Sequence, residues 1–228
     1  MIKIIFRICI YSVWDGINFR NLGMDISLKS HWDKIYQSKA FQELTWAQEV
    51  PHTSLDFIKD FNLPLSASII DIGGGDSRLV DHLLELGYTD VTVLDISEQS
   101  LERARQRLGN NADKVKWLVG DVRTFACEHP YDLWHDRAAF HFLVTEEDVR
   151  NYLQMAGRCV NQYMILGTFS TTGPTKCSGL PVHQYSDQQL AQLFMEDFNK
   201  IKCINVDHVT PTKATQNFTF CSFRKKAA

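Results

Sequence analysis

Glycines and acidic residues that suit nucleoside binding gather in one stretch and at a later strand end. An apolar, β-branched run over residues 68–72 contains Asp71, and three glycines follow it: Gly73, Gly74 and Gly75. Glycine has no Cβ and adopts positive φ, so such a turn lets the backbone approach a ligand closely. A second apolar run, residues 91–94, ends at Asp95. A carboxylate there can accept hydrogen bonds from ribose hydroxyls. The pattern predicts a site for a nucleoside-containing cofactor.

The glycine spacing discriminates between kinds of cofactor. A dinucleotide fingerprint reads G-x-G-x-x-G, with a helix N-terminus facing a pyrophosphate. In this chain Arg78 stands at the third glycine position, and Asp76 lies where a pyrophosphate would approach. Like charges repel, so a cofactor without phosphate fits better. A nucleotide-binding oxidoreductase is therefore disfavoured, and a tight turn without a ligand is the plainer alternative.

A second polar cluster, residues 135–141, follows a predicted strand at residues 131–135. It contains His135, Asp136, Arg137 and His141. A histidine can act as a general base near neutral pH, and an Asp–Arg pair can orient a polar substrate. We therefore expect His135 or His141 to accept a proton and Arg137 to orient the substrate. The alternative is a structural ion pair between Asp136 and Arg137, with His141 packed under the sheet.

The elements that must position these residues alternate between strand and helix. Further strands are expected at residues 115–119 and 163–168, and helices begin near Ser77, after Ser97 and over residues 146–159. Such alternation predicts a parallel sheet, whose ligands bind beyond the carboxyl ends of the strands. Asp121, just past the third strand, could accept a hydrogen bond from an adenine amine. A turn-forming aspartate is the alternative there.

Residues 24–62 read as two helical segments ahead of the sheet, the second capped by Ser54. In the first, Trp32 and Tyr36 lie four residues apart and share a face. They are expected to cover the site, with residues 44–49 as a further part of the cover. An amphipathic helix that packs its aromatic side chains on the core is the alternative.

Downstream of the fifth strand, the chain carries a long loop and a predicted hairpin. The loop, residues 169–182, is rich in Gly, Pro, Ser and Thr, and loops of that length are usually functional or disordered. A helix over residues 187–194 follows. Two extended runs, residues 202–208 and 216–223, flank a proline-containing turn and predict an antiparallel hairpin.

Composition fits one globular domain. The chain has 228 residues, 44% of them hydrophobic, and a net charge of −3, which gives no basic surplus to attract nucleic acid or an anionic membrane. The six cysteines are widely spaced without a C-x-x-C pair. That spacing argues against a zinc site or a disulfide framework and favours a reducing cytoplasm.

The first residues stand apart from this organisation. The apolar stretch over residues 4–13 is interrupted by Arg7 and is shorter than the roughly 20 residues that a membrane span needs. We interpret residues 1–23 as an N-terminal extension ahead of a start at Met24, with a signal peptide as the alternative. Residues 24–228 then form a single domain.

Four stretches resemble class I S-adenosylmethionine-dependent methyltransferases. Residues 71–75 with Asp95 resemble the first two motifs of that family. Trp32, Asp33 and Tyr36 match a W-D-x-x-Y pattern found ahead of the sheet in several of its groups. The blocks W-H-D-R-A-A-F-H-F-L, residues 134–143, and G-P-T-K-C-S-G-L-P, residues 173–181, are similar to those of a group of small bacterial members.

The resemblance implies an α/β, Rossmann-like fold with a seven-stranded, mostly parallel sheet, helices on both faces and a C-terminal antiparallel hairpin. It implies S-adenosylmethionine as the cofactor. Asp71 and the three glycines would hold its methionine end, Asp95 with Ile96 its ribose, and Asp121 with Val122 its adenine, under the cover of Trp32 and Tyr36. Asp136, Lys176 and Cys177 would face the acceptor. Cys177 is not expected to act as a nucleophile, because methyl transfer needs none.

Methyl transfer to a small molecule is the function expected from these features. A base-amine motif of the N-P-P-Y type and an aromatic, basic patch are both absent from the sequence, which disfavours nucleic acid. Protein lysine methylation is the second hypothesis. A regulatory protein that binds S-adenosylmethionine without catalysis is the third.

Overall fold

The computed structural model describes residues 28–227. The predicted extension, residues 1–23, and the predicted start at Met24 lie outside the described residues.

The central sheet has seven strands in the order β3-β2-β1-β4-β5-β9-β8. The strands are β1 (Ser68–Ile72), β2 (Asp90–Asp95), β3 (Val115–Val119), β4 (Tyr131–Arg137), β5 (Val160–Phe169), β8 (Phe198–Val209) and β9 (Thr215–Lys225). The first five pair in parallel, and β9 lies antiparallel between β5 and β8. This confirms the predicted fold class, including the terminal hairpin. Strand order reverses between β1 and β4, which is where open sheets of this kind bind ligands.

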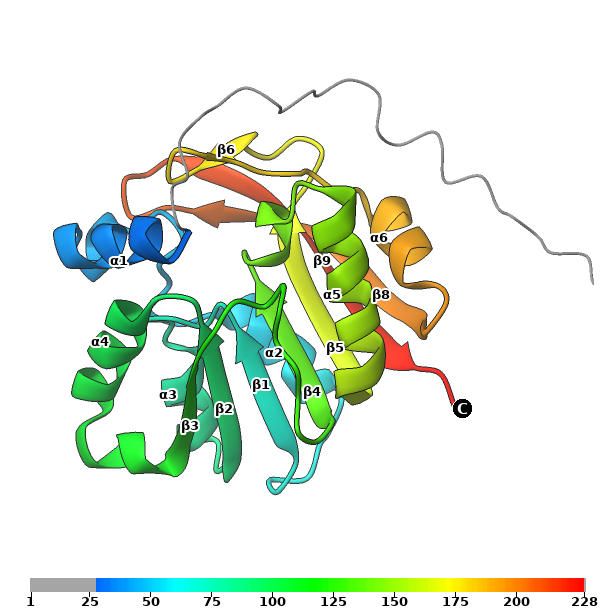
Figure 1. The fold of residues 1–228 in the computed structure, drawn as a ribbon, viewed down its shortest axis with the longest axis horizontal. Helices are drawn as coiled ribbons and strands as arrows, with labels where there is room; N and C mark the ends of the chain where they lie inside the picture. Colours follow the sequence, from blue (N-terminus) through cyan, green and yellow to red (C-terminus); the bar gives the residue numbers. More distant parts are fainter. Residues whose placement is uncertain (1–27, 228) are drawn as a thin grey trace, which may run out of the picture.

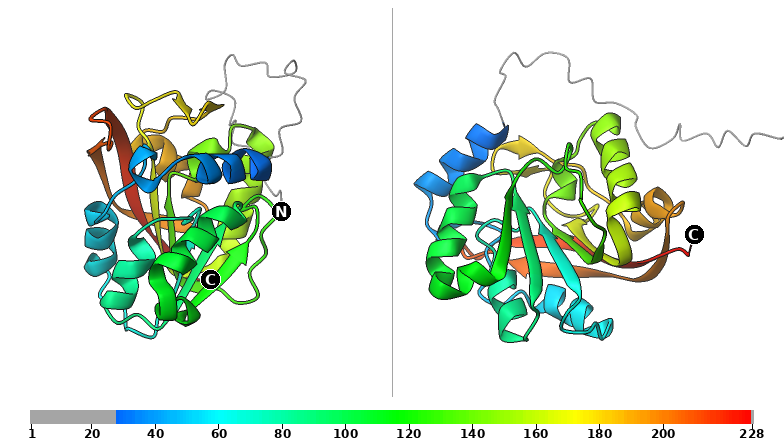
Figure 2. Two further views of the ribbon diagram at one scale, coloured as in Figure 1. Left: turned by 90° about the vertical axis from the view of Figure 1, so that its left-hand side faces the viewer. Right: turned by 60° about the horizontal axis from the view of Figure 1, so that its bottom comes forward.

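Helices cover both faces of the sheet (Figures 1 and 2). They are α1 (Leu28–Ser38), α2 (His52–Asp60), α3 (Leu79–Glu85), α4 (Glu98–Leu108), α5 (Glu146–Cys159) and α6 (Asp187–Phe194), with short 3₁₀ turns at Phe41–Glu43, Gly109–Lys114 and Phe140–Phe142. The apolar sides of α2, α3 and α4 form one core layer with alternate residues of the strands. Those of α5 and α6 form the other. The β-strand period of two divides each central strand between the two layers.

Helix starts agree with the sequence at some places and not at others. Ser97 caps α4, as predicted, by accepting a hydrogen bond from the Ser100 amide at 3.3 Å. The predicted cap at Ser54 is wrong, because α2 begins at His52 and buries Ser54 on its inner side. Ser77 accepts a hydrogen bond from the Leu79 amide at 3.1 Å, one residue ahead of the helix cap at Arg78.

The loop after β5 lies over the carboxyl ends of the parallel strands. It contains a two-residue antiparallel pairing of β6 (Lys176–Cys177) with β7 (Leu180–Pro181). In Figure 1, β6 and α1 both lie above the ends of the parallel strands. The segments that the sequence marks as a cover and as a long loop therefore meet at the carboxyl side of the sheet.

Four cysteines form disulfides, which makes the prediction of unpaired cysteines wrong for them. Cys127 bonds to Cys159, and Cys203 bonds to Cys221. Cys203 and Cys221 lie directly opposite each other on β8 and β9. Residues far apart in the sequence are brought together by the sheet, so their spacing alone could not show the pairing.

Candidate functional site

A cavity opens at the carboxyl ends of β1, β2, β3 and β4. Its volume is about 940 Å³, including the part open to solvent. Its lining residues come from α1 and the segment after it, from the strand ends and the loops that follow them, and from β5, β6 and β9: Leu28, Trp32, Tyr36, Trp46, Ile72, Gly73, Leu94, Asp95, Ile96, Gly120, Asp121, Val122, Arg123, Arg137, Ala138, Ala139, Phe142, Leu143, Phe169, Cys177, Gln216 and Phe218. The lining is mostly apolar, with a few charged groups.

The turn after β1 needs glycine at two positions. Gly73 has φ +63°, and a Cβ on it would lie 2.8 Å from the Cβ of Ala139. Gly75 has φ +44°, and a Cβ there would lie 2.8 Å from Oδ2 of Asp95. Both conformations and both contacts exclude a side chain. Of the three predicted glycines, Gly73 lines the cavity, whereas Gly74 and Gly75 belong to the turn but do not line the cavity.

Asp95 ends β2 and lines the cavity although its side chain is buried. One carboxylate oxygen accepts a hydrogen bond from the Ser97 amide at 2.7 Å. Burial raises the pKa of Asp95 to about 7, and the negative charge of Asp71 adds to the shift. Ile96 forms the neighbouring wall. A carboxylate at this strand tip with one oxygen already held fits the acceptor that ribose hydroxyls require.

Asp121 and Val122 line the same cavity beyond β3. The Asp121 carboxylate pairs with Arg123, whose Nε donates to Oδ2 at 2.9 Å. Burial acts to raise the pKa of Asp121, but the hydrogen bonds from Arg123 outweigh it and hold that pKa below its usual value. Asp121 is thus an ionised acceptor at the position predicted for the adenine.

Helix α1 supplies the predicted cover. Trp32 lines the cavity and packs edge-on against Trp46 and Phe142, with ring centroids 5.7 and 5.1 Å apart. Tyr36 is buried and lines the cavity beside Gly75. Asp33 accepts a hydrogen bond from the Ser97 hydroxyl at 2.7 Å. These contacts join the cover to the start of α4, directly after Asp95.

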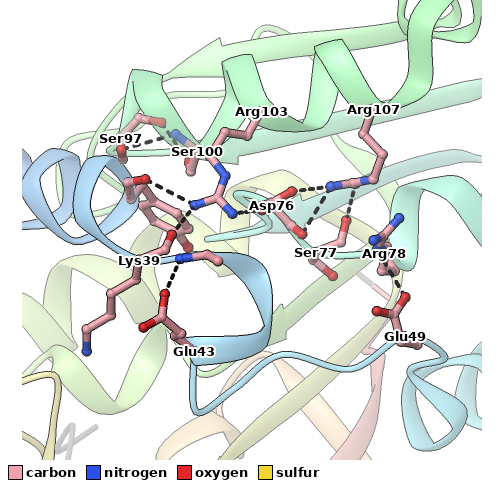
Figure 3. Close-up of polar contacts among 12 residues, drawn as sticks. Lys39, Glu43, Glu49, Asp76, Ser77, Arg78, Ser97, Ser100, Arg103 and Arg107 are labelled. Carbon is pink, nitrogen blue, oxygen red and sulfur yellow. Dashed lines mark hydrogen bonds and ion pairs between the residues drawn. The ribbon is translucent and has the colours of Figure 1, made fainter. Parts of the chain in front are cut away.

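Asp76 faces the arginines of α4 instead of the cavity (Figure 3). Its side chain is 6% exposed, contacts Arg103 at 3.0 Å and forms a close ion pair with Arg107. Arg103 also donates to the backbone oxygens of Tyr36 and Lys39. Contrary to the prediction, Asp76 does not repel a phosphate in the cavity, because its charge is neutralised by Arg103 and Arg107 and turned away.

His135 and Asp71 form a buried pair behind the cavity wall. Nδ1 of His135 lies 2.7 Å from Oδ1 of Asp71, and its Nε2 lies 2.9 Å from the Ser54 hydroxyl. His135 is 2% exposed and both its nitrogens are engaged. Neither residue lines the cavity, which contradicts direct contact of His135 with an acceptor. The Asp71 side chain instead packs against the glycine turn, because a Cβ on Gly74 would lie 2.6 Å from Oδ2 of Asp71.

His141 is also excluded from the cavity. Its ring is fully buried, stacks on Phe169 with centroids 4.3 Å apart and accepts a hydrogen bond from the Phe169 amide. Burial, together with the positive charge of Arg137, lowers the pKa of His141 to about 3. The ring stays neutral and has no contact with the cavity, so the predicted proton-accepting role is wrong on geometry.

Asp136 and Arg137 point to opposite faces of β4. The Asp136 carboxylate accepts a hydrogen bond from the Tyr152 hydroxyl at 2.7 Å, and burial raises its pKa to about 6. Arg137 lines the cavity and donates from Nη1 to the Trp46 carbonyl at 2.9 Å. The alternative ion pair between the two is absent. Asp136 holds the backbone after β4 and does not face the acceptor.

The loop after β5 contributes one of its two predicted residues. Cys177 lines the cavity, and burial raises the pKa of its thiol, which disfavours a nucleophilic thiolate. Lys176 is exposed and outside the cavity.

The lining residues that the sequence analysis did not single out include three at the β5–β9 edge of the cavity: Phe169, Gln216 and Phe218. Phe169 pairs with Phe218 across β5 and β9. The antiparallel insertion of β9 brings them to the cavity, and the hairpin prediction could have indicated this edge without giving its register.

Residues 28–227 contain no cluster of three His, Cys, Asp or Glu side chains that could hold a metal ion. None of the helices in the same range is both long enough and apolar enough to cross a membrane.

Comparison with known proteins gives a family match over the first half of the sheet. Residues 69–162 match a family model described as a methyltransferase domain. Among curated proteins, mouse EEF1A lysine methyltransferase 2 is 25% identical over 85 residues, which cover 34% of this chain and 35% of that protein. The match therefore spans about a third of the relative's length.

Two solved structures share the fold across most of the chain. The 1,6-didemethyltoxoflavin-N1-methyltransferase of Burkholderia thailandensis, with bound 1,6-didemethyltoxoflavin and S-adenosylhomocysteine, is 19% identical with a TM-score of 0.65. The alignment covers 88% of this chain and 85% of that one. Magnesium protoporphyrin IX methyltransferase of Synechocystis, with bound S-adenosylmethionine, is 17% identical with a TM-score of 0.62, covering 88% and 92%.

The strand order, the glycine turn with its acidic strand tips and the methyltransferase-domain match agree with one another. Residues 69–162 thus match a methyltransferase domain, within a chain that has the fold of solved methyltransferase structures.

Proposed function

We propose that the protein transfers a methyl group from S-adenosylmethionine to a small-molecule acceptor. The observation that carries the proposal is the single cavity described at the strand ends, which joins Gly73, Asp95 and Asp121 to an aromatic wall. Gly73, Asp95 and Asp121 fit a nucleoside. The aromatic wall offers space and apolar contact for an acceptor beside the nucleoside.

When bound, S-adenosylmethionine would supply a methyl group on a positively charged sulfur. An acceptor atom would bond to the methyl carbon in line with the sulfur, which leaves as part of S-adenosylhomocysteine. Asp95 would accept from the ribose hydroxyls and Asp121 from the adenine amine. Trp32 and Tyr36 would cover the bound molecule and exclude water. Alignment and exclusion of water are the main contributions that such a reaction needs from the protein.

The described residues that line the acceptor side include no general base. The titratable groups there are Arg137 and Cys177; Arg137 is cationic, and burial raises the pKa of the Cys177 thiol. His135 and His141 are behind the wall. The acceptor atom is therefore one that carries a free electron pair at neutral pH or loses its proton to water.

Protein lysine methylation is the second candidate function. It is favoured by the sequence match to mouse EEF1A lysine methyltransferase 2. The cover formed by α1 and the loop after β5 favours a small acceptor instead, because a lysine on a folded protein must reach the cavity through that cover. A regulatory protein that binds the cofactor without turnover is the third candidate.

The first test is calorimetric titration with S-adenosylmethionine, S-adenosylhomocysteine and NAD. The proposal expects the first two to bind and NAD not to. Trp32→Ala should weaken S-adenosylhomocysteine binding about tenfold, as expected for losing roughly 1.4 kcal/mol of ring contact. Lys34→Ala, an exposed change on the same helix, should leave it unaltered. Binding of NAD alone would overturn the proposal.

The acceptor class is tested with methyl-labelled S-adenosylmethionine and a cell extract divided by filtration. Label in the small-molecule fraction supports the first candidate. Label in the protein fraction supports lysine methylation. Tight binding with label in neither fraction supports the regulatory candidate.

A cytoplasmic location stays a prediction. The two disulfides count against it, because disulfides are rare in reducing compartments. Counting the free thiols by alkylation with and without reductant tests that point.

A further inference from the structure

Arg137 carries a charge that no described carboxylate neutralises. It forms no ion pair with residues 28–227, and its neighbour in sequence, Asp136, faces the other side of the sheet. Its Nη2 is buried without a hydrogen-bond partner in the same range. Burial lowers the pKa of Arg137 to about 10, which still leaves it cationic at neutral pH. Arg137 as a whole is half-buried, but a guanidinium nitrogen shielded from water, in a group that faces no acid, is costly unless something else pairs with it.

Neighbouring groups contact the guanidinium of Arg137 but leave its Nη2 without a hydrogen-bond partner among the described residues. Nη1 donates to the Trp46 carbonyl at 2.9 Å. The guanidinium carbon lies 5.4 Å from the ring centroid of Phe218. The acid with most influence on it is Asp71, whose carboxylate is already bonded to His135. The backbone turns sharply just after Arg137, where Ala138 has φ +68°. Strained backbone of this kind is concentrated at functional sites.

The position of Arg137 assigns it to the acceptor side of the cavity. Asp95 and Asp121 mark the nucleoside side at the ends of β2 and β3. Arg137 instead contacts Trp46 and Phe218, beyond β4. A sulfonium between these two sides would bring a second positive charge into the same cavity. An anionic acceptor group would offset both charges.

On the basis of the proposed function, we propose that Arg137 binds a carboxylate of the methyl acceptor. The acceptor is thus a small, largely apolar or aromatic carboxylic acid, with its ring or chain against Phe169 and Phe218. The guanidinium suits this group because its planar N–H donors match carboxylate geometry. The carboxylate of the cofactor's own methionine has the same chemistry, and the experiment separates the two sources.

The first arm measures acid preference in the complex with S-adenosylhomocysteine. Benzoate and phenylacetate are titrated beside their neutral amides, benzamide and phenylacetamide. The wild-type protein should bind each acid at least tenfold more tightly than its amide. Arg137→Met and Arg137→Gln should abolish that difference, and Arg137→Lys should keep part of it. Equal binding of acids and amides by the wild type, or binding of neither, would overturn the proposal.

The second arm identifies the carboxylate. S-adenosylhomocysteine carries the amino-acid carboxylate, whereas 5′-methylthioadenosine lacks it. Arg137→Met should leave both affinities within about twofold of wild type. Selective loss of S-adenosylhomocysteine binding would assign the guanidinium to the cofactor and overturn the acceptor role.

Matched controls separate this outcome from misfolding and from failure of the proposed function. Arg224→Met removes an exposed arginine that lies over the Tyr163 ring, 5.9 Å from its centroid, outside the cavity. It should retain the acid preference. Unchanged thermal unfolding of the Arg137 variants shows that they fold. If the wild type fails to bind S-adenosylhomocysteine at all, the proposed function fails, and the acid preference of the free protein then decides the role of Arg137 separately.

Discussion

At the scale of single residues, the charge state of each acid in and around the site depends on whether a cation pairs with it. Asp121 is ionised by Arg123, and Asp76 is neutralised by two arginines. Asp95 differs, because burial raises its pKa to about 7 with no cation bonded to it among the described residues. Its charge state therefore changes within the physiological pH range, and a ligand that donates hydrogen bonds to it should alter that state.

We expect S-adenosylhomocysteine to bind more tightly as pH rises through 7. Ribose hydroxyls donate to the ionised carboxylate, so below its pKa the protonated form of Asp95 must lose a proton on binding. With a pKa of about 7 in the free protein, affinity should increase about tenfold between pH 6 and pH 8 and level off above. Calorimetry across this range measures the slope.

Asp95→Asn supplies the control for this pH dependence. The amide still accepts a hydrogen bond but does not titrate. Its affinity should be weaker at pH 8 and flat across the range. An unchanged slope in this variant would mean that another group titrates.

At the scale of elements, an ion-pair network fastens the cover to the glycine turn. Asp76 lies directly after the turn, Arg103 and Arg107 lie on α4, and Arg103 also holds the end of α1 through backbone oxygens (Figure 3). Arg107 reaches Asp81 on α3 at 2.8 Å as well. The Asp76 carboxylate therefore links the turn to α4 directly, and to α1 and α3 through Arg103 and Arg107.

Asp76→Ala should lower the free energy of unfolding by about 3 kcal/mol, because it leaves the partly buried Arg103 without an acid and Arg107 with Asp81 alone. Urea unfolding at neutral pH measures the change. The exposed pair of Lys116 and Asp90, 2.8 Å apart, is the matched control. Asp90→Ala should cost less than about 1 kcal/mol, as exposed ion pairs do. Equal losses in the two variants would contradict a special role for the network.

At the scale of the whole molecule, strand pairing and two disulfides connect segments of the C-terminal half that are distant in the sequence. Strand β9 inserts between β5 and β8, and Cys203–Cys221 joins β8 to β9. Cys127–Cys159 ties the segment before β4 to the end of α5. Closing loops of this length restricts the unfolded chain and typically contributes about 2–4 kcal/mol per disulfide.

A thiol count tests these links and the compartment prediction together. Of the six cysteines, four are paired, Cys177 is free, and Cys9 lies outside the described residues. Reduction before alkylation in denaturant should therefore add four labels to the intact mass beyond those taken up without reductant. Six labels without reductant would contradict both disulfides and restore the argument for a reducing compartment.

The sequence by itself determined the order and type of the elements and the residues at the strand tips. Apolar runs that end in Asp95 and Asp121 predict their shared edge, because parallel strands place their carboxyl ends together. The bounds of α5, α6 and β3 agree with the structure, since caps and periodicity are local signals. The period of two in a strand also separates Asp136 from Arg137, once β4 is known to extend to Arg137.

Only the tertiary structure decided which polar side chains face the cavity. His135 and Arg137 share a face of β4, yet α2 packs Ser54 over the first and leaves the second at the open end. His141 is turned into the core by the 3₁₀ turn after β4 and stacked on Phe169. Register across β5 and β9 brings Phe218 to Arg137, and register across β8 and β9 brings Cys203 to Cys221. Such contacts depend on packing between elements that are distant in the chain, which no local pattern encodes.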